Sequence, residues 1–105
     1  MITNRSELIR DNQQRLQLKN RLLQIITQKN ICNAWKDRND LHQRNRRFET
    51  RVVPENINVS LLIDAVLQTL NPVDVDYYLN DCSKQPETLR TIITNMIVNH
   101  LWRLE

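Results

Sequence analysis

The chain contains no glycine, and this absence constrains its fold more than any other feature of the sequence. Tight β-hairpin turns need residues with a positive backbone φ, which glycine adopts most easily, so here only Asn and Asp could supply them. The prolines Pro54, Pro72 and Pro86 are far apart and leave long uninterrupted stretches between them. We therefore expect an all-α protein rather than a hairpin-rich β fold.

A chain of 105 residues, 40% of them apolar, is long enough for one domain with a modest core. The aromatic side chains are few, so we expect the interior to consist mainly of Leu, Ile and Val, with Trp35 and Phe48 as anchors. These proportions favour helix–helix packing. We predict a small bundle of four or five helices with a long amphipathic basic helix at its N-terminus.

The charges divide the chain into two halves. Residues 1–53 carry twelve Lys or Arg and five Asp or Glu, a net of +7, whereas residues 54–105 carry three and seven, a net of −4. We place the boundary at Pro54 and predict a basic helical segment, 1–53, and an apolar three-helix segment, 54–105, within one compact domain. The two halves could attract each other, or each could meet a partner of its own.

Helical periodicity in the basic half is strongest over 5–29. A break is expected between Asn30 and Asn33, because Asn competes for backbone hydrogen bonds, and a second helix is expected over 34–50. The apolar residues of the first helix are predicted to share one broad face: Leu8, Ile9, Leu16, Leu22, Leu23 and Ile26. Ile9, Leu16 and Leu23 also follow a seven-residue step, as at a coiled-coil edge, which predicts a homodimer through this helix.

Three helices are predicted in the apolar half. Asn58 or Ser60 can cap a helix that ends at Leu70, a short helix follows over 73–82, and Pro86 can open a helix that reaches Leu104. The side chains predicted to form the core are Leu62, Val66, Leu70, Leu79, Leu89, Ile93, Met96 and Leu101.

No catalytic or metal-binding motif is present in the sequence. Cys32, His42, Cys82 and His100 do not have the short spacings of structural zinc sites. The sequence shows no apolar leader, no run of about 18 apolar residues and no paired cysteine motif, so we expect free thiols and an intracellular protein, cytoplasmic or nuclear, without a membrane span. We predict a protein that is not an enzyme and that uses no cofactor.

The basic residues after residue 34 raise the alternative of RNA or DNA binding. On a helical wheel, four of them fall within about 80° of each other, and Arg offers a forked set of donors to phosphate. They are Lys36, Arg44, Arg47 and Arg51. The other interpretation is a solvated face that pairs with the acidic half of the chain or with an acidic protein.

Residues 60–99 carry a resemblance to known domains. The stretch 67–79 reads LQTLNPVDVDYYL, and 86–89 reads PETL before a terminal apolar helix. This pattern resembles the three-helix CUE and UBA-type ubiquitin-binding modules, in which an apolar–Pro pair and a di-leucine-like pair contact the apolar patch of ubiquitin. The resemblance implies that the contact residues here are Leu70, Pro72, Met96 and Ile97.

The same order of helices is also similar to the first helices of HEAT-repeat scaffolds, such as the middle domain of translation-initiation scaffolds, which would imply an excerpt of a larger solenoid. A third interpretation is that the corner at Leu70 and Pro72, together with Met96, only closes a small bundle. From these alternatives we predict a non-catalytic protein–protein interaction module that binds another protein, with ubiquitin and a helical partner as the candidates.

Overall fold

The computed structural model describes residues 5–44 and 50–104. In these residues it contains five α-helices and one 3-10 turn and no strand, which confirms the all-α prediction. The elements are α1 (Arg5–Ile25), α2 (Gln28–Arg44), α3 (Val59–Thr69), α4 (Pro72–Asn80), η1 (Cys82–Lys84) and α5 (Pro86–Leu104).

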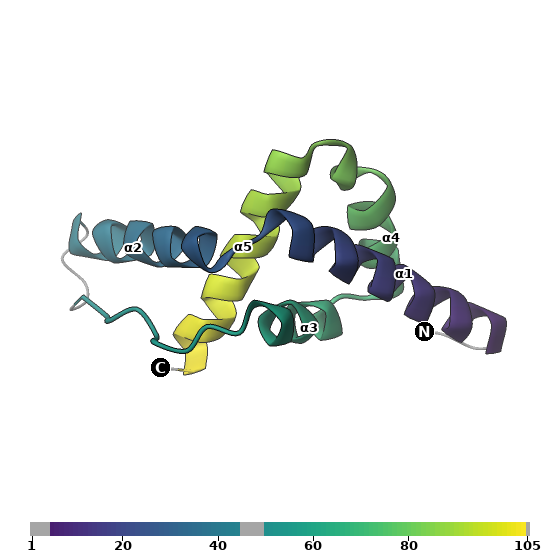
Figure 1. Ribbon diagram of the computed structural model, residues 1–105, viewed down its shortest axis with the longest axis horizontal. Helices are drawn as coiled ribbons and strands as arrows, with labels where there is room; N and C mark the ends of the chain where they lie inside the picture. Colours follow the sequence, from purple (N-terminus) through teal and green to yellow (C-terminus); the bar gives the residue numbers. More distant parts are fainter. Residues whose placement is uncertain (1–4, 45–49, 105) are drawn as a thin grey trace.

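The long helix α5 crosses the middle of the molecule and contacts α1, α2, α3 and η1 (Figure 1). Helix α1 packs on α3 and α4, and α2 packs along α5. Because α1 and α2 project toward opposite ends, the molecule measures 49 × 25 × 25 Å. The elongated shape leaves much of the surface of α1 and α2 open to solvent.

The boundary between α1 and α2 lies earlier than the sequence pattern predicted. Helix α1 ends at Ile25 and α2 already begins at Gln28, so the break predicted at residues 30–33 is wrong. Asn30 Oδ1 accepts a hydrogen bond from the Thr27 backbone N–H at 2.8 Å, and the Asn30 N–H donates to Thr27 Oγ1 at 3.3 Å. This reciprocal pair is a capping box, so Asn30 starts a helix here instead of ending one.

Asparagine side chains cap the first two helices of the apolar half, and of these caps Asn58 was predicted from the sequence whereas Asn71 was not. Asn58 Oδ1 accepts from the Leu61 N–H at 3.0 Å at the start of α3. Asn71 Oδ1 accepts from the Asp74 N–H at 2.9 Å, with Pro72 in the first turn of α4. These side chains satisfy backbone donors that a helix leaves unpaired at its first turn.

The helix ends depend on arginines from distant segments. Arg90 on α5 donates from Nε to the carbonyl oxygen of Ile25 at 2.6 Å, where α1 ends. Arg15 on α1 donates to the carbonyl oxygens of Leu67 (2.5 Å) and Leu70 (2.8 Å), where α3 ends. Glycine commonly closes helix C-termini, and in this glycine-free chain forked guanidinium groups bind the exposed carbonyls instead.

One apolar core joins all five helices. Of the predicted core, Val66, Leu79, Leu89 and Ile93 are buried. The other four residues are half-buried and pack against the core: Leu62, Leu70, Met96 and Leu101. Trp35 is completely buried and anchors α2 as predicted, whereas Phe48 lies outside the described residues.

Candidate functional site

Helix α1 has two apolar faces that point in opposite directions. Leu18 and Leu22 are completely buried against the core, whereas Ile9, Leu16 and Leu23 are 51%, 60% and 42% exposed. We call the last three residues the outer stripe. The predicted single broad face is therefore wrong, because the core takes Leu22 and Ile26 while Leu8 and the outer stripe remain in solvent.

The surroundings of the outer stripe are polar but nearly uncharged. Asn12, Gln13 and Asn20 are exposed amides that adjoin the stripe on the helical surface. Two cations lie beside it: Arg5 precedes Ile9 by one turn at the exposed start of the helix, and Lys19 donates from Nζ to Asp64 Oδ2 at 2.9 Å. An apolar ligand could therefore approach the stripe without leaving a charge of this helix buried and unpaired.

Helix α3 packs against α1 on the side of Arg15 and Lys19. Arg15 contacts Leu67, and Lys19 contacts Asp64, so α1 and α3 run antiparallel. This register places Leu61, which is 63% exposed, at about the level of Leu23. A shallow groove between the two helices, lined in part by Leu16 and Leu67, extends the surface toward α3.

The four residues implied by the ubiquitin-binding resemblance have different environments. Pro72 is half-buried in a groove between α1 and α4, and the carbonyl oxygen of Leu70 is bound by Arg15. Met96 is half-buried on α5. Ile97 is completely buried in the core, so its side chain has no surface to offer a partner.

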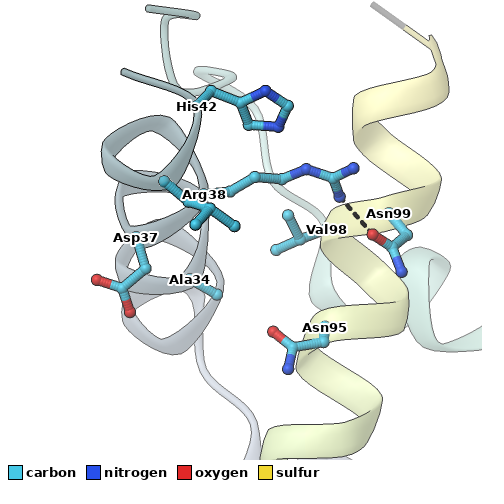
Figure 2. A pocket seen from close by; sticks show the side chains of 8 residues that line it. Ala34, Asp37, Arg38, His42, Asn95, Val98 and Asn99 are labelled. Carbon is cyan, nitrogen blue, oxygen red and sulfur yellow. Dashed lines mark hydrogen bonds between the residues drawn. The ribbon is translucent and has the colours of Figure 1, made fainter. Parts of the chain in front are cut away.

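A pocket of about 370 Å³ lies between α2 and α5 (Figure 2). Arg38 extends from α2 across the pocket and donates a hydrogen bond to Asn99 Oδ1 on α5. The residues that line the pocket are Ala34, Asp37, Arg38, Leu41, His42, Asn95, Val98 and Asn99. The lining holds no serine, cysteine or lysine that could act as a nucleophile, and its polar groups are suited to holding the two helices together.

Two arginines and a histidine contact the ring of Trp102 beside this pocket. The guanidinium carbons of Arg51 and Arg38 lie 4.2 and 4.7 Å from the Trp102 ring centroid, and the ring of His42 stacks on it at 5.0 Å. Arg51 Nη1 also donates to the Trp102 carbonyl oxygen at 2.8 Å, near the end of α5. Partial burial lowers the pKa of Arg38, and the charges of Arg51 and Arg103 lower it further.

The backbone of Arg51 is held by two buried side chains of α2. Trp35 Nε1 donates to the Arg51 carbonyl oxygen at 3.1 Å, and Asn39 Nδ2 donates to the same oxygen at 2.7 Å. The Arg51 N–H in turn donates to Asn39 Oδ1 at 2.9 Å. This double contact fixes the segment that follows residue 50 against α2.

The predicted basic stripe along one helix does not form as expected. Helix α2 ends at Arg44, and Arg51 lies in a non-helical segment with its side chain against Trp102. Lys36 and Arg44 are exposed on α2, and Arg47 lies outside the described residues. The sequence reading missed Arg38 and Trp102, because their contact joins segments more than 60 positions apart.

The cysteines and histidines do not form a site. Cys32 is half-buried and Cys82 is buried, and both are unpaired thiols. Burial raises the pKa of Cys82, so its thiol stays protonated and unreactive at neutral pH. Across residues 5–44 and 50–104, no group of three or more potential metal ligands comes together.

No family model, curated protein or solved structure matches the chain. The resemblances to CUE and UBA-type modules and to HEAT scaffolds therefore stay predictions. Within the described ranges, none of the helices combines the length and the apolar character required to cross a lipid bilayer.

Proposed function

We propose that the chain is a non-catalytic protein-interaction module whose binding surface is the outer stripe of α1. The observation that carries the proposal is the exposure of Ile9, Leu16 and Leu23 along one line of the helix, on the side opposite the core. Scattered exposed apolar residues need no explanation, but a row at a regular helical step matches the anchor pattern of helix-to-helix recognition.

The energetics support a partner of modest affinity. Complete burial of a Leu or Ile side chain contributes about 1.5–3 kcal/mol, so burying the exposed halves of the three stripe residues contributes about 3 kcal/mol before association costs. Leu16 occupies the centre of the row, where the residues that dominate binding are usually found.

Selection from a library of helical peptides displayed on phage tests this proposal without knowledge of the natural partner. We expect selected peptides to carry apolar residues at helical spacing and to bind Leu16→Lys at least about tenfold more weakly than the wild-type chain. The matched control is Gln17→Lys, which adds the same charge one position away at an exposed site off the stripe. The proposal would be contradicted if no peptide were selected, or if the selected peptides bound the Leu16→Lys variant and the wild type with equal affinity.

Ubiquitin is a specific partner to test, because of the sequence resemblance. Titration of ubiquitin into the isotope-labelled chain is expected to shift resonances around Pro72 and Met96 if the resemblance extends to binding. Shifts confined to the outer stripe would instead favour the surface proposed here. Unchanged spectra at about millimolar ubiquitin would remove ubiquitin from consideration.

Nucleic-acid binding is a second candidate, favoured by the convergence of Arg38 and Arg51 around Trp102. Lys36 and Arg44 are also exposed on α2, but they point about 160° and 120° away from Arg38 around that helix. Phosphate contacts release counterions, so binding would weaken steeply between about 50 and 200 mM salt. Electrophoretic mobility with a short duplex and a single strand tests it, and the absence of a shift at the lower salt concentration would eliminate this candidate.

A further inference from the structure

We propose that the partner of the outer stripe is a second copy of this chain, and that two α1 helices pair antiparallel about a two-fold axis at Leu16. This inference rests on the proposed function, because it identifies the occupant of the same surface. It differs from a general helical partner in predicting which residues meet across the interface.

The positions of the stripe residues are symmetric about Leu16. Ile9 lies seven residues before it and Leu23 seven residues after it. In an antiparallel pair centred on Leu16, the Ile9 of each copy therefore meets the Leu23 of the other. The same symmetry brings Asn12 opposite Asn20, so amide groups that can donate and accept hydrogen bonds face each other.

The charges on this face favour the antiparallel direction. In a parallel pair, Lys19 would meet Lys19, and Arg5 would meet Arg5 at the exposed start of the helix. The antiparallel pair instead places Lys19 opposite the neutral Gln13, while Lys19 keeps its contact with Asp64. Like charges directly opposite each other are unfavourable, and the antiparallel arrangement moves the two Arg5 side chains to opposite ends of the interface.

The fold leaves room for a second helix on this face. Helices α3 and α4 pack on the inner side of α1, and the stripe residues are on the other side, so the body of each copy lies away from the interface (Figure 1). Three half-exposed side chains from each copy make a narrow contact, smaller than the roughly 1,200–2,000 Å² of stable complexes. The dimer is therefore expected to be weak and to depend on protein concentration.

Sedimentation velocity measures this association directly. We expect the wild-type chain to sediment as a monomer at about 10 µM and to approach the dimer mass at about 1 mM. Leu16→Lys and Leu16→Glu should each remain monomeric, because like charges would meet at the axis, whereas an equimolar mixture of the two should associate. Gln17→Lys and Gln17→Glu serve as controls, and far-ultraviolet circular dichroism verifies that each variant is folded.

Disulfide trapping tests the direction of the pair. In a background with Cys32→Ala and Cys82→Ala, a mixture of Ile9→Cys and Leu23→Cys chains should cross-link under mild oxidation. Either chain alone should not, because its two thiols would lie about 21 Å apart, well beyond disulfide reach. Cross-linking of Ile9→Cys alone would show a parallel pair and overturn the proposal.

The outcomes separate this inference from the proposed function. A wild-type chain that stays monomeric at about 1 mM overturns self-pairing. If the chain stays monomeric but the selected peptides bind the wild type and do not bind the Leu16→Lys variant, the stripe is a docking surface for a different protein. In that case the proposed function stands. If the wild type associates but the mixture of Leu16→Lys and Leu16→Glu chains does not, the two-fold axis does not pass through Leu16 and the proposed pairing is wrong.

Discussion

Leu16 and Leu18, two positions apart on α1, lie on opposite sides of that helix: Leu16 is 60% exposed and Leu18 is completely buried. Two residues correspond to about 200° of rotation, so one side chain enters the core while the other points into solvent. Most surface helices expose polar residues on the side away from the core, and α1 departs from this pattern. The proposed interaction depends on this second apolar face.

Substitution of Arg15 tests how much its hydrogen bonds at the end of α3 contribute to stability. We call this set of contacts the arginine clamp. Arg15 binds the carbonyl oxygens of Leu67 and Leu70 and also Asp11 Oδ2, at 2.7 Å. Arg15→Met would remove these donors and leave the buried carboxylate of Asp11 without its cation. We expect the free energy of unfolding to fall by about 2–4 kcal/mol in urea denaturation.

The matched control for Arg15→Met is Arg10→Met, which alters an exposed residue of the same helix. Its free energy of unfolding should remain within about 0.5 kcal/mol of the wild-type value. Equal losses from the two substitutions would show that the clamp contributes no more than an ordinary surface arginine.

Asn39 is expected to hold the segment at Arg51 in place. Its side chain accepts from the Arg51 N–H and donates to the Arg51 carbonyl oxygen, and it is buried. Asn39→Ala leaves both backbone groups without this partner, which should cost about 1–3 kcal/mol. Hydrogen exchange of the Arg51 amide should become faster in Asn39→Ala and remain unchanged in Asn33→Ala, an exposed control on α2. Unchanged protection in both variants would argue against this role.

Alkaline pH should destabilise the fold through Cys82. Burial raises the pKa of its thiol above the ordinary value of 9.0, so the unfolded chain loses this proton first as the pH rises. The stabilisation that comes from the raised pKa of Cys82 is fully present below about pH 9. As the pH rises from there through the pKa of the folded state, this stabilisation is lost and the free energy of unfolding falls. Burial and the nearby Asp74 raise the pKa of Tyr78 as well, which adds a loss at higher pH.

Urea denaturation at about pH 8, 9 and 10 measures this dependence. Cys82→Ala should reduce the loss of stability between pH 9 and 10. The same slope in the wild type and in Cys82→Ala would exclude Cys82 as the source.

The sequence predicted the parts of the fold that local chemistry determines. Asn58 and Pro86 mark helix starts because a capping side chain or a proline acts within one turn of its own position. The end of α1 differs from the sequence prediction, because Thr27 and Asn30 together form a capping box that starts α2, whereas Asn30 alone is typical of a helix break.

Long-range contacts explain what the sequence could not show. Arg15 and Arg90 bind carbonyl groups of helices distant in the chain, so no local pattern marks them. The helical wheel of α1 carries apolar residues on two sides, and only the positions of α3 and α4 decide which side is buried. The exposure of the outer stripe, and thus the candidate site, could be recognised only from the packed structure.

The most direct test of this account compares Leu16→Ala with Leu18→Ala by urea denaturation at about 5 µM, where we expect the chain to be monomeric. The two substitutions remove the same atoms and have the same effect on intrinsic helix propensity. Leu18→Ala should lower the free energy of unfolding by about 2–5 kcal/mol, because it leaves a cavity in the core, and Leu16→Ala by less than about 1 kcal/mol. Similar losses at both positions would contradict the claim that α1 buries one apolar face and leaves the other free to bind.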